Sequence, residues 1–460
     1  MLLKSAHQLR HALKMRLMSS PGVRRILSNT GWLFIDRIVR MGLGLLVGLW
    51  VARYLGPEQF GIFNYATAFI TIFSVIASMG LETSVVRDLV RNPENAPEIL
   101  GTTFVLRLLG AVTAYGAACA TIWIMHPQDP VTVWAVAILG AGMIFQATDT
   151  IDLWFQAKVR AKFTVIAKSA AFFALSLAKV ALILNGAPLL AFVWAGLTEL
   201  ALGMAALCLS YHIAGGEFRA WRFSTAQAIA QLKDGWPLVL SAFSVIIYMK
   251  IDQVMLGGMR GNAEVGIYSA AVRLSEVWYF IPTAIATSVY PTIVASKEVD
   301  EGLYLNRIQM LYDYTVWIFL IIAAPISLLS GPLVTLLFGP DYREAGIILA
   351  IHIWSSIFVS LGVARGKWLV TEGLMRFAML TQMMGCISNI LLNLLLIPKM
   401  GGTGAAIATL ISYAIASYLS CFFHPKTWHA GRMLTLALVA PVRVLSTVTS
   451  RKKGGHGLGQ

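Results

Sequence analysis

The sequence predicts an all-α protein that crosses a membrane about twelve times, and three observations lead to this fold class. Twelve long apolar stretches fill the 460 residues, positive charge lies on alternate sides of them, and part of the first half recurs in the second. Hydrophobic residues make up 57% of the chain and charged residues 13%, with a mean hydropathy of +0.72. A soluble globular protein of this length is therefore excluded.

Each apolar stretch is long enough to cross a bilayer as a helix, because a hydrocarbon core of about 30 Å needs roughly 20 apolar residues. The first six predicted spans cover residues 30–54, 59–84, 99–125, 131–156, 163–185 and 188–213. The second six cover residues 236–258, 265–295, 310–338, 345–365, 374–397 and 403–423. The sequence thus predicts two lobes of six helices each, over residues 29–213 and 236–423.

Three further segments flank and join these lobes. Residues 1–28 alternate basic and leucine residues, which predicts an amphipathic helix on the cytoplasmic leaflet rather than a cleavable signal peptide. Residues 214–235 form a predicted cytoplasmic linker, and residues 424–460 a basic cytoplasmic tail. An apolar run at Met433–Leu445 leaves open a thirteenth span, but that span would carry the basic end of the tail to the outer side.

The distribution of Lys and Arg predicts the orientation. Of 36 such residues, 25 fall on one side of the predicted spans and only Arg260, Arg343 and Lys399 on the other. Loops on the cytoplasmic side carry the Lys/Arg excess, so both termini are predicted to be cytoplasmic in a multi-pass protein. This rule explains the net charge of +14, and we predict no binding of nucleic acid.

The loops exclude several classes of function. Those on the outer side are only a few residues long, which leaves no room for the catalytic outer loop of a polysaccharide polymerase or ligase. The longer cytoplasmic loops contain no phosphate-binding glycine loop and no carboxylate cluster for Mg²⁺. All four cysteines lie within predicted spans without metal-ligand spacing. The sequence therefore predicts no enzyme, no cofactor and no metal, and any energy coupling would come from ions or the membrane potential.

An internal repeat links the two halves at an offset of about 205 residues. The segment from Gly56 to Ala66 and the segment from Gly261 to Ala271 both place four residues between a glycine and Gly-Ile-aromatic. Short turns into apolar helices can also resemble one another by chance. A parallel repeat is nevertheless the arrangement found in many secondary transporters, and the charge rule gives both halves the same orientation.

Charged residues inside the spans are the candidate functional residues, because each central charge costs roughly 2.5–3.5 kcal/mol and usually faces a wet cavity or a partner. Guanidinium groups suit a diphosphate, since their planar fork donates two hydrogen bonds at once. Local pairs at Asp36/Arg40 and Arg273/Glu276 offer an alternative, purely structural explanation. The predicted substrate-binding residues are Arg37, Arg40, Arg107, Lys179, Lys250 and Arg273, and the candidates for ion coupling are Asp36, Glu199, Asp252 and Glu276.

Three segments resemble the Wzx-type polysaccharide flippases, within the superfamily of MATE-like exporters. They are residues 252–257 with 266–282, residues 52–57 with Phe60-Gly61, and residues 401–408. The resemblance covers roughly residues 25–425. It implies a MATE-like fold of two six-helix lobes around a central cavity, in which Arg273 and the arginines of the first span contact the diphosphate or acidic sugars.

The same resemblance implies an activity and a location. The expected activity is movement of undecaprenyl-diphosphate-linked oligosaccharide across the bacterial inner membrane by alternating access. Expected partners are membrane lipids, a polysaccharide polymerase and a chain-length regulator. Two other functions stay open: an ion-coupled MATE-like exporter of small organic molecules, and, against the short outer loops, a membrane polymerase or ligase.

Overall fold

The computed structural model describes residues 21–440, and every regular element in that range is a helix. Ten stretches within it are long and apolar enough to cross a membrane. Two of these stretches contain a non-helical glycine that divides a long helix in two: Gly56 in α2 (Pro21–Ser78) and Gly401 in α16 (Met375–Ser417). Each half of α2 and α16 matches one predicted span. The twelve spans predicted from the sequence are therefore found within the described range.

The remaining helices follow the predicted order. In the first half of the chain they are α3 (Glu82–Arg91), α4 (Ala96–Met125), α5 (Pro130–Gln146), α6 (Thr150–Ala157), α7 (Ala161–Leu184) and α8 (Leu189–Ile213). In the second half they are α9 (Thr225–Arg260), α10 (Asn262–Glu276), α11 (Phe280–Lys297), α12 (Glu301–Leu328), α13 (Ser330–Phe338), α14 (Ala345–His352), α15 (Ser355–Thr371) and α17 (Trp428–Leu438). Four predicted spans consist of two helices with a short break between them: α5 and α6, α10 and α11, α12 and α13, and α14 and α15.

The chain divides into two compact units. Within the described residues, the first unit consists of residues 21–51 and 73–240, and the second of residues 52–72 and 241–440. Residues 52–72, around the turn at Gly56, thus pack with the second half of the chain, although they lie in the first half of the sequence. The division into lobes at residues 29–213 and 236–423 remains a prediction.

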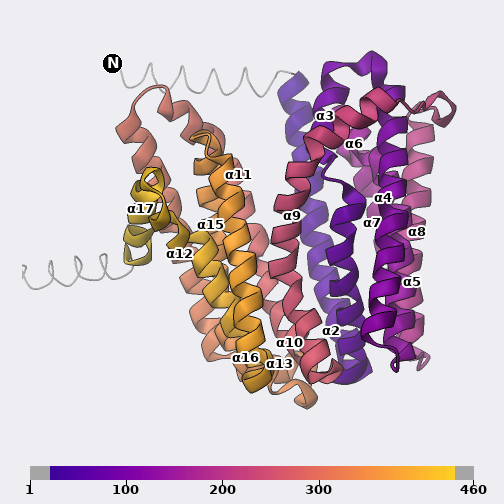
Figure 1. The fold of residues 1–460 in the computed structure, drawn as a ribbon, viewed down its shortest axis with the longest axis vertical. Coiled ribbons are helices and arrows are strands. Elements are labelled where there is room, and N and C mark those ends of the chain that lie inside the picture. Colours follow the sequence, from indigo (N-terminus) through magenta and orange to yellow (C-terminus); the bar gives the residue numbers. More distant parts are fainter. Residues whose placement is uncertain (1–20, 441–460) are drawn as a thin grey trace, which may run out of the picture. The chain divides into compact units, whose positions relative to one another are not determined.

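Within the first unit, α4, α5, α7 and α8 form a bundle in which α7 packs on α8 and α5 packs on both α4 and α8 (Figure 1). Small residues line these contacts. For example, a Cβ at Gly142 on α5 would lie 2.3 Å from a methyl carbon of Leu200 on α8. Close approach of this kind is how apolar helices associate within a membrane. The bundle therefore brings any polar side chains of α5, α7 and α8 near to one another.

Within the second unit, α10 packs on α14 and α16, and α12 packs on α11 and α15. A buried cluster that includes Tyr312 and Phe319 joins α12 to α15 and α17. Helix α17 buries Ala430, Met433 and Leu434 in this cluster. As described, α17 has 11 residues and is about 16 Å long, which is too short to cross a bilayer.

The segment that joins the predicted lobes is partly helical. Helix α9 begins at Thr225, so the predicted linker 214–235 is helical over its second half. The side-chain amide of Gln231 holds this part of α9 against α4, because it accepts a hydrogen bond from the hydroxyl of Thr103 and donates one to the carbonyl of Ile99. The predicted N-terminal segment 1–28 and tail 424–460 are described only from residue 21 and up to residue 440, and the rest of both predictions lies outside the described residues.

One basic residue assigned to a cytoplasmic loop is buried. Arg365 is 3% exposed and donates to the carbonyl of Ala416 at 2.8 Å and to the hydroxyls of Thr381 and Ser420. Its guanidinium therefore donates hydrogen bonds at the C-terminal end of α16, where the last helical carbonyls have no partner within the helix. The burial of Arg365 does not test the side of the membrane to which the sequence assigns it, because a guanidinium can bind a helix end at either surface.

The repeat seen in the sequence has a structural counterpart. Gly56 and Gly261, at equivalent positions of the repeat, have nearly the same conformation, with φ/ψ of 69°/171° and 93°/174°. This region of positive φ is open to glycine and costly for other residues. Each glycine lets one helix end and the next begin with almost no intervening loop.

Candidate functional site

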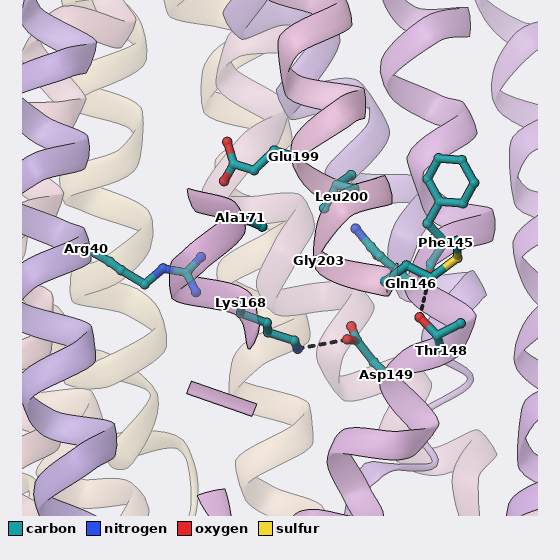
Figure 2. A pocket seen from close by; sticks show the side chains of 11 residues that line it. Arg40, Phe145, Gln146, Thr148, Asp149, Lys168, Ala171, Glu199, Leu200 and Gly203 are labelled. Atoms are coloured by element: carbon teal, nitrogen blue, oxygen red, sulfur yellow. Dashed lines mark hydrogen bonds and ion pairs between the residues drawn. The ribbon is translucent and has the colours of Figure 1, made fainter. Parts of the chain in front are cut away.

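The first unit contains a polar cavity of about 210 Å³ that residues of α2, α5, α7 and α8 line (Figure 2). Four charged side chains line it: Arg40 from α2, Asp149 from the 3-10 turn η2 (Ala147–Asp149), Lys168 from α7 and Glu199 from α8. The other lining residues are Phe145, Gln146, Thr148, Ala171, Leu200, Gly203 and Met204. The break between α5 and α6 thus carries part of this lining.

The charges of this bundle pair across helices. The ammonium group of Lys168 lies 2.8 Å from Asp149 and 3.6 Å from Asp152. That of Lys179 lies 2.9 Å from Glu199 on the neighbouring helix α8. The sequence left pairing with another span open for Lys179, and the structure supplies the partner.

Arg40 also borders the cavity and does not form the local pair with Asp36 that the sequence left open as an alternative. Its guanidinium lies over the ring of Phe172, 5.0 Å from the centroid, and no carboxylate among residues 21–440 is within ion-pair distance of it. Asp36, which could have paired with Arg40 one turn away, instead accepts a hydrogen bond from Ser169 on α7. Arg37 is exposed. The local ion pair of the first span is therefore absent from the described structure, which leaves Arg40 without a carboxylate there.

Arg107 lies in a smaller cavity of about 70 Å³ that shares Gln146 and Asp149 with the first. Its side chain is only 4% exposed, and its nearest carboxylate, Glu82 on α3, is 3.7 Å away. That distance permits charge attraction but no hydrogen bond. Within residues 21–440, its Nε and Nη2 atoms have no hydrogen-bond partner. Arg107 is thus a buried cation that is only partly compensated.

In the second unit, the local pair Arg273/Glu276, which the sequence left open as an alternative, does not form. Glu276 instead accepts from Lys250 on α9 at 3.3 Å, with both side chains about three-quarters buried. Arg273, one turn earlier on α10, has no carboxylate partner in the part of the chain that the structure describes. The two predicted cations of this region therefore differ: the charge of Lys250 is compensated and that of Arg273 is not.

Asp252 is buried in a cage of neutral polar groups. The carboxylate is 2% exposed and accepts from the Tyr268 hydroxyl at 2.7 Å, the Asn393 amide at 2.5 Å and the Thr409 hydroxyl at 2.5 Å. Asn389 lies beside Asn393. The three donors come from α10 and from both halves of α16. No cation among residues 21–440 is within ion-pair distance, so neutral hydrogen bonds alone stabilise the charged form.

The sequence did not single out Gln146, Thr148, Asp149 and Lys168 as site residues. Asp149 was visible as a charge in an apolar stretch, but its position on a 3-10 turn facing α7 was not. The cage around Asp252 was also missed, since Asn389, Asn393 and Thr409 are ordinary residues in apolar helices. A polar residue recurring at a four-residue interval, as at Asn389 and Asn393, was the available signal.

Two protein-family models match this chain. Residues 26–297, more than half of the chain, match the model of the family described as polysaccharide biosynthesis protein, and residues 237–395 match the MatE family. The probable flippase AglR of Haloferax volcanii is 25% identical over 410 residues, which cover 85% of this chain and 82% of that protein.

Solved structures agree on the fold. An inward-facing multidrug resistance MATE family transporter superposes with a TM-score of 0.70 at 16% identity, covering 87% of this chain and 98% of that one. The lipid II flippase MurJ, in an inward closed conformation, superposes with a TM-score of 0.69 at 15% identity, covering 92% of this chain and 93% of that one. These likenesses confirm the MATE-like fold predicted from the sequence. The chain belongs to the polysaccharide biosynthesis protein family.

Proposed function

We propose that this protein is a flippase, not an enzyme, which moves a lipid-linked oligosaccharide across the membrane by alternating access. Family membership supports a role in polysaccharide biosynthesis. Relatives named as flippases support the transport of a glycan on a lipid carrier. The carrier that we propose is undecaprenyl diphosphate.

The observation that carries the proposal is the uncompensated guanidinium of Arg273. A charge within a membrane-spanning helix is costly unless a partner or a wet cavity receives it. The carboxylate that the sequence offers to Arg273, Glu276, is taken by Lys250. A diphosphate would supply the missing anion and could accept two hydrogen bonds from one guanidinium.

The other predicted cations have different parts in this proposal. Lys179 and Lys250 are each neutralised by a glutamate, so they keep the helices polar without attracting an anion. Arg107 is attracted to Glu82. Arg40 has no carboxylate partner in the described structure and lines the cavity of the first unit, and Arg37 is exposed. The proposal assigns the diphosphate to neither of them.

Ion coupling is assigned to Asp252. Asp36 accepts a hydrogen bond from Ser169, and Glu199 and Glu276 are held by lysines. Asp252 is the most buried of the four candidates and is held only by neutral groups. Loss or gain of one proton or small cation there would change the charge of the cage that joins α9, α10 and α16.

The proposed location is the inner membrane of a bacterium, with both termini in the cytoplasm, and it rests on the distribution of Lys and Arg. A polymerase and a chain-length regulator that use the translocated repeat unit are the proposed partners. Membrane lipids surround the carrier's polyprenyl chain.

An exporter of small organic molecules is the second candidate, since residues 237–395 match the MatE family. Proteoliposomes discriminate the two functions. Purified protein is reconstituted with an undecaprenyl-diphosphate oligosaccharide that carries a fluorophore on its glycan, and a membrane-impermeant reductant destroys the fluorophores of the outer leaflet. We expect the protein to make nearly all of the label reducible, against about half in empty liposomes. If the label stays protected while ethidium is transported in the same vesicles, the exporter is correct.

A further inference from the structure

The cavity of the first unit has a charge pattern that does not suit a diphosphate. Two basic residues, Arg40 and Lys168, and two acidic residues, Asp149 and Glu199, line it. Their formal charges cancel, and Figure 2 shows Lys168 joined to Asp149 across the cavity. The two carboxylates would repel an added anion, and the two basic groups would repel an added cation. An uncharged ligand with many hydrogen-bonding groups is repelled by neither pair.

The lining offers hydrogen bonds of both kinds. Arg40 and Lys168 only donate, the carboxylates of Asp149 and Glu199 accept, and the amide of Gln146 does both. The hydroxyl of Thr148 donates to the carbonyl of Phe145 and can still accept. A sugar hydroxyl is itself a donor and an acceptor. Phe145, Leu200 and Met204 add apolar surface to the lining. A lining with both apolar and polar surface matches a pyranose ring, which has C–H faces and hydroxyl edges.

Size restricts the ligand further. The cavity measures about 210 Å³, which is below the roughly 300–1,000 Å³ typical of pockets for drug-sized ligands. It is equivalent to about seven water molecules at about 30 Å³ each. One sugar ring fits this volume, and an oligosaccharide does not.

We propose that this cavity is a subsite for a single uncharged sugar residue of the transported glycan. The inference rests on the proposed function, because the sugar is part of the lipid-linked substrate. It separates two tasks: the first unit recognises one sugar through balanced charges, while Arg273 on α10 receives the diphosphate. It also departs from the sequence expectation that the arginine of this region, Arg40, meets acidic sugars.

Gly203 offers a way to close the cavity without disturbing the fold. It lines the cavity from α8, and a Cβ added there has no atom within 4 Å. Replacement of a helical glycine by alanine or leucine also favours the helix. Gly116 on α4 provides a matched control, because it is exposed, an added Cβ there likewise has no atom within 4 Å, and it does not line the cavity.

The experiment uses the full chain in lipid nanodiscs. Binding of the methyl glycosides of glucose, galactose, N-acetylglucosamine and glucuronic acid is followed by saturation-transfer NMR, and binding of undecaprenyl diphosphate is measured separately. We expect at least one uncharged glycoside to bind the wild type at least ten times more tightly than the glucuronide. We expect Gly203→Leu to weaken that binding at least tenfold and Gly203→Ala by a smaller factor. Gly116→Leu is expected to bind like the wild type.

The proposal is overturned if no uncharged glycoside binds, if the glucuronide binds as tightly, or if both Gly203 variants bind like the wild type. Should Gly203→Leu fail to fold, Gly203→Ala decides the question alone. Binding of undecaprenyl diphosphate is expected to be the same in all variants. Its absence from the wild type would contradict the proposed function and would leave a sugar site standing, so the two failures are distinguishable.

Discussion

Gly61 and Gly266 pack backbone against backbone at equivalent positions of the internal repeat. A Cβ on Gly61 would lie 1.7 Å from the carbonyl oxygen of Asn262, and a Cβ on Gly266 would lie 2.0 Å from that of Pro57. Pro57 and Asn262 are themselves equivalent in the repeat, so the contact is symmetric. It explains why residues 52–72 pack with the second unit, since only glycine permits so close an approach.

Substitution at this contact should therefore be costly. We expect Gly61→Ala and Gly266→Ala each to destabilise the protein by about 3 kcal/mol or more, because the added carbon meets backbone rather than a movable side chain. The midpoint of thermal unfolding in detergent, followed by tryptophan fluorescence, measures this effect. Gly258→Ala is the control, because an added Cβ there has no atom within 4 Å. Unfolding midpoints equal to that of the control would mean that the contact is not required.

Arg273 should require its guanidinium for transport. We expect Arg273→Ala to slow flipping about 10- to 100-fold, which corresponds to loss of roughly 1.5–3 kcal/mol from hydrogen bonds to a charged group. Arg273→Lys is expected to be less impaired, since it keeps the charge but loses the planar fork. The rate of label exposure in proteoliposomes checks both variants, with the exposed Arg219→Ala as control. Near-normal rates for both Arg273 variants would reduce the residue to a structural role.

The pair Lys179–Glu199 should be coupled in stability. Both side chains are about four-fifths buried, so removal of one leaves a charge without its partner. We expect Lys179→Met alone and Glu199→Gln alone each to cost about 1–3 kcal/mol, less than the 3–5 kcal/mol found for fully buried pairs. The double variant should be more stable than the sum of the single effects predicts. Additive shifts of the unfolding midpoint would show that the pair contributes nothing.

Asp252→Asn should uncouple transport from the ion gradient. Asparagine keeps the size of the side chain and can still accept from Tyr268 and Thr409, so we expect a folded protein. Flipping is measured with and without an imposed proton gradient, and then with an imposed sodium gradient. We expect stimulation by one gradient in the wild type and in the exposed control Asp341→Asn, and none in Asp252→Asn. Equal stimulation in Asp252→Asn would place the coupling elsewhere.

The fold could be predicted from the sequence because each signal that predicts it depends on many residues together. Apolar length and loop charge are averaged over many residues, so the burial of Arg365 did not disturb the twelve spans. The turn glycines Gly56 and Gly261 were also visible, because a left-handed turn restricts the residue type strongly.

Individual contacts could not be predicted in the same way. Glu276 is one turn from Arg273 but pairs with Lys250 from α9, because helix rotation and packing decide which of two cations the carboxylate faces. Likewise, Asp149 meets Lys168 only because α5 ends in a 3-10 turn beside α7. Interactions within one helix follow from spacing, whereas those between helices depend on packing angles that the spacing does not contain.

The most direct test of flipping is the sidedness of the lipid-linked oligosaccharide in sealed membrane vesicles. Vesicles of known orientation are prepared from cells with and without this protein, and the glycan accessible at the outer face is labelled with an impermeant reagent. We predict that the labelled fraction falls severalfold without the protein and is restored by the wild type but not by Arg273→Ala. An unchanged fraction in vesicles that lack the protein and every related flippase would contradict the proposed function.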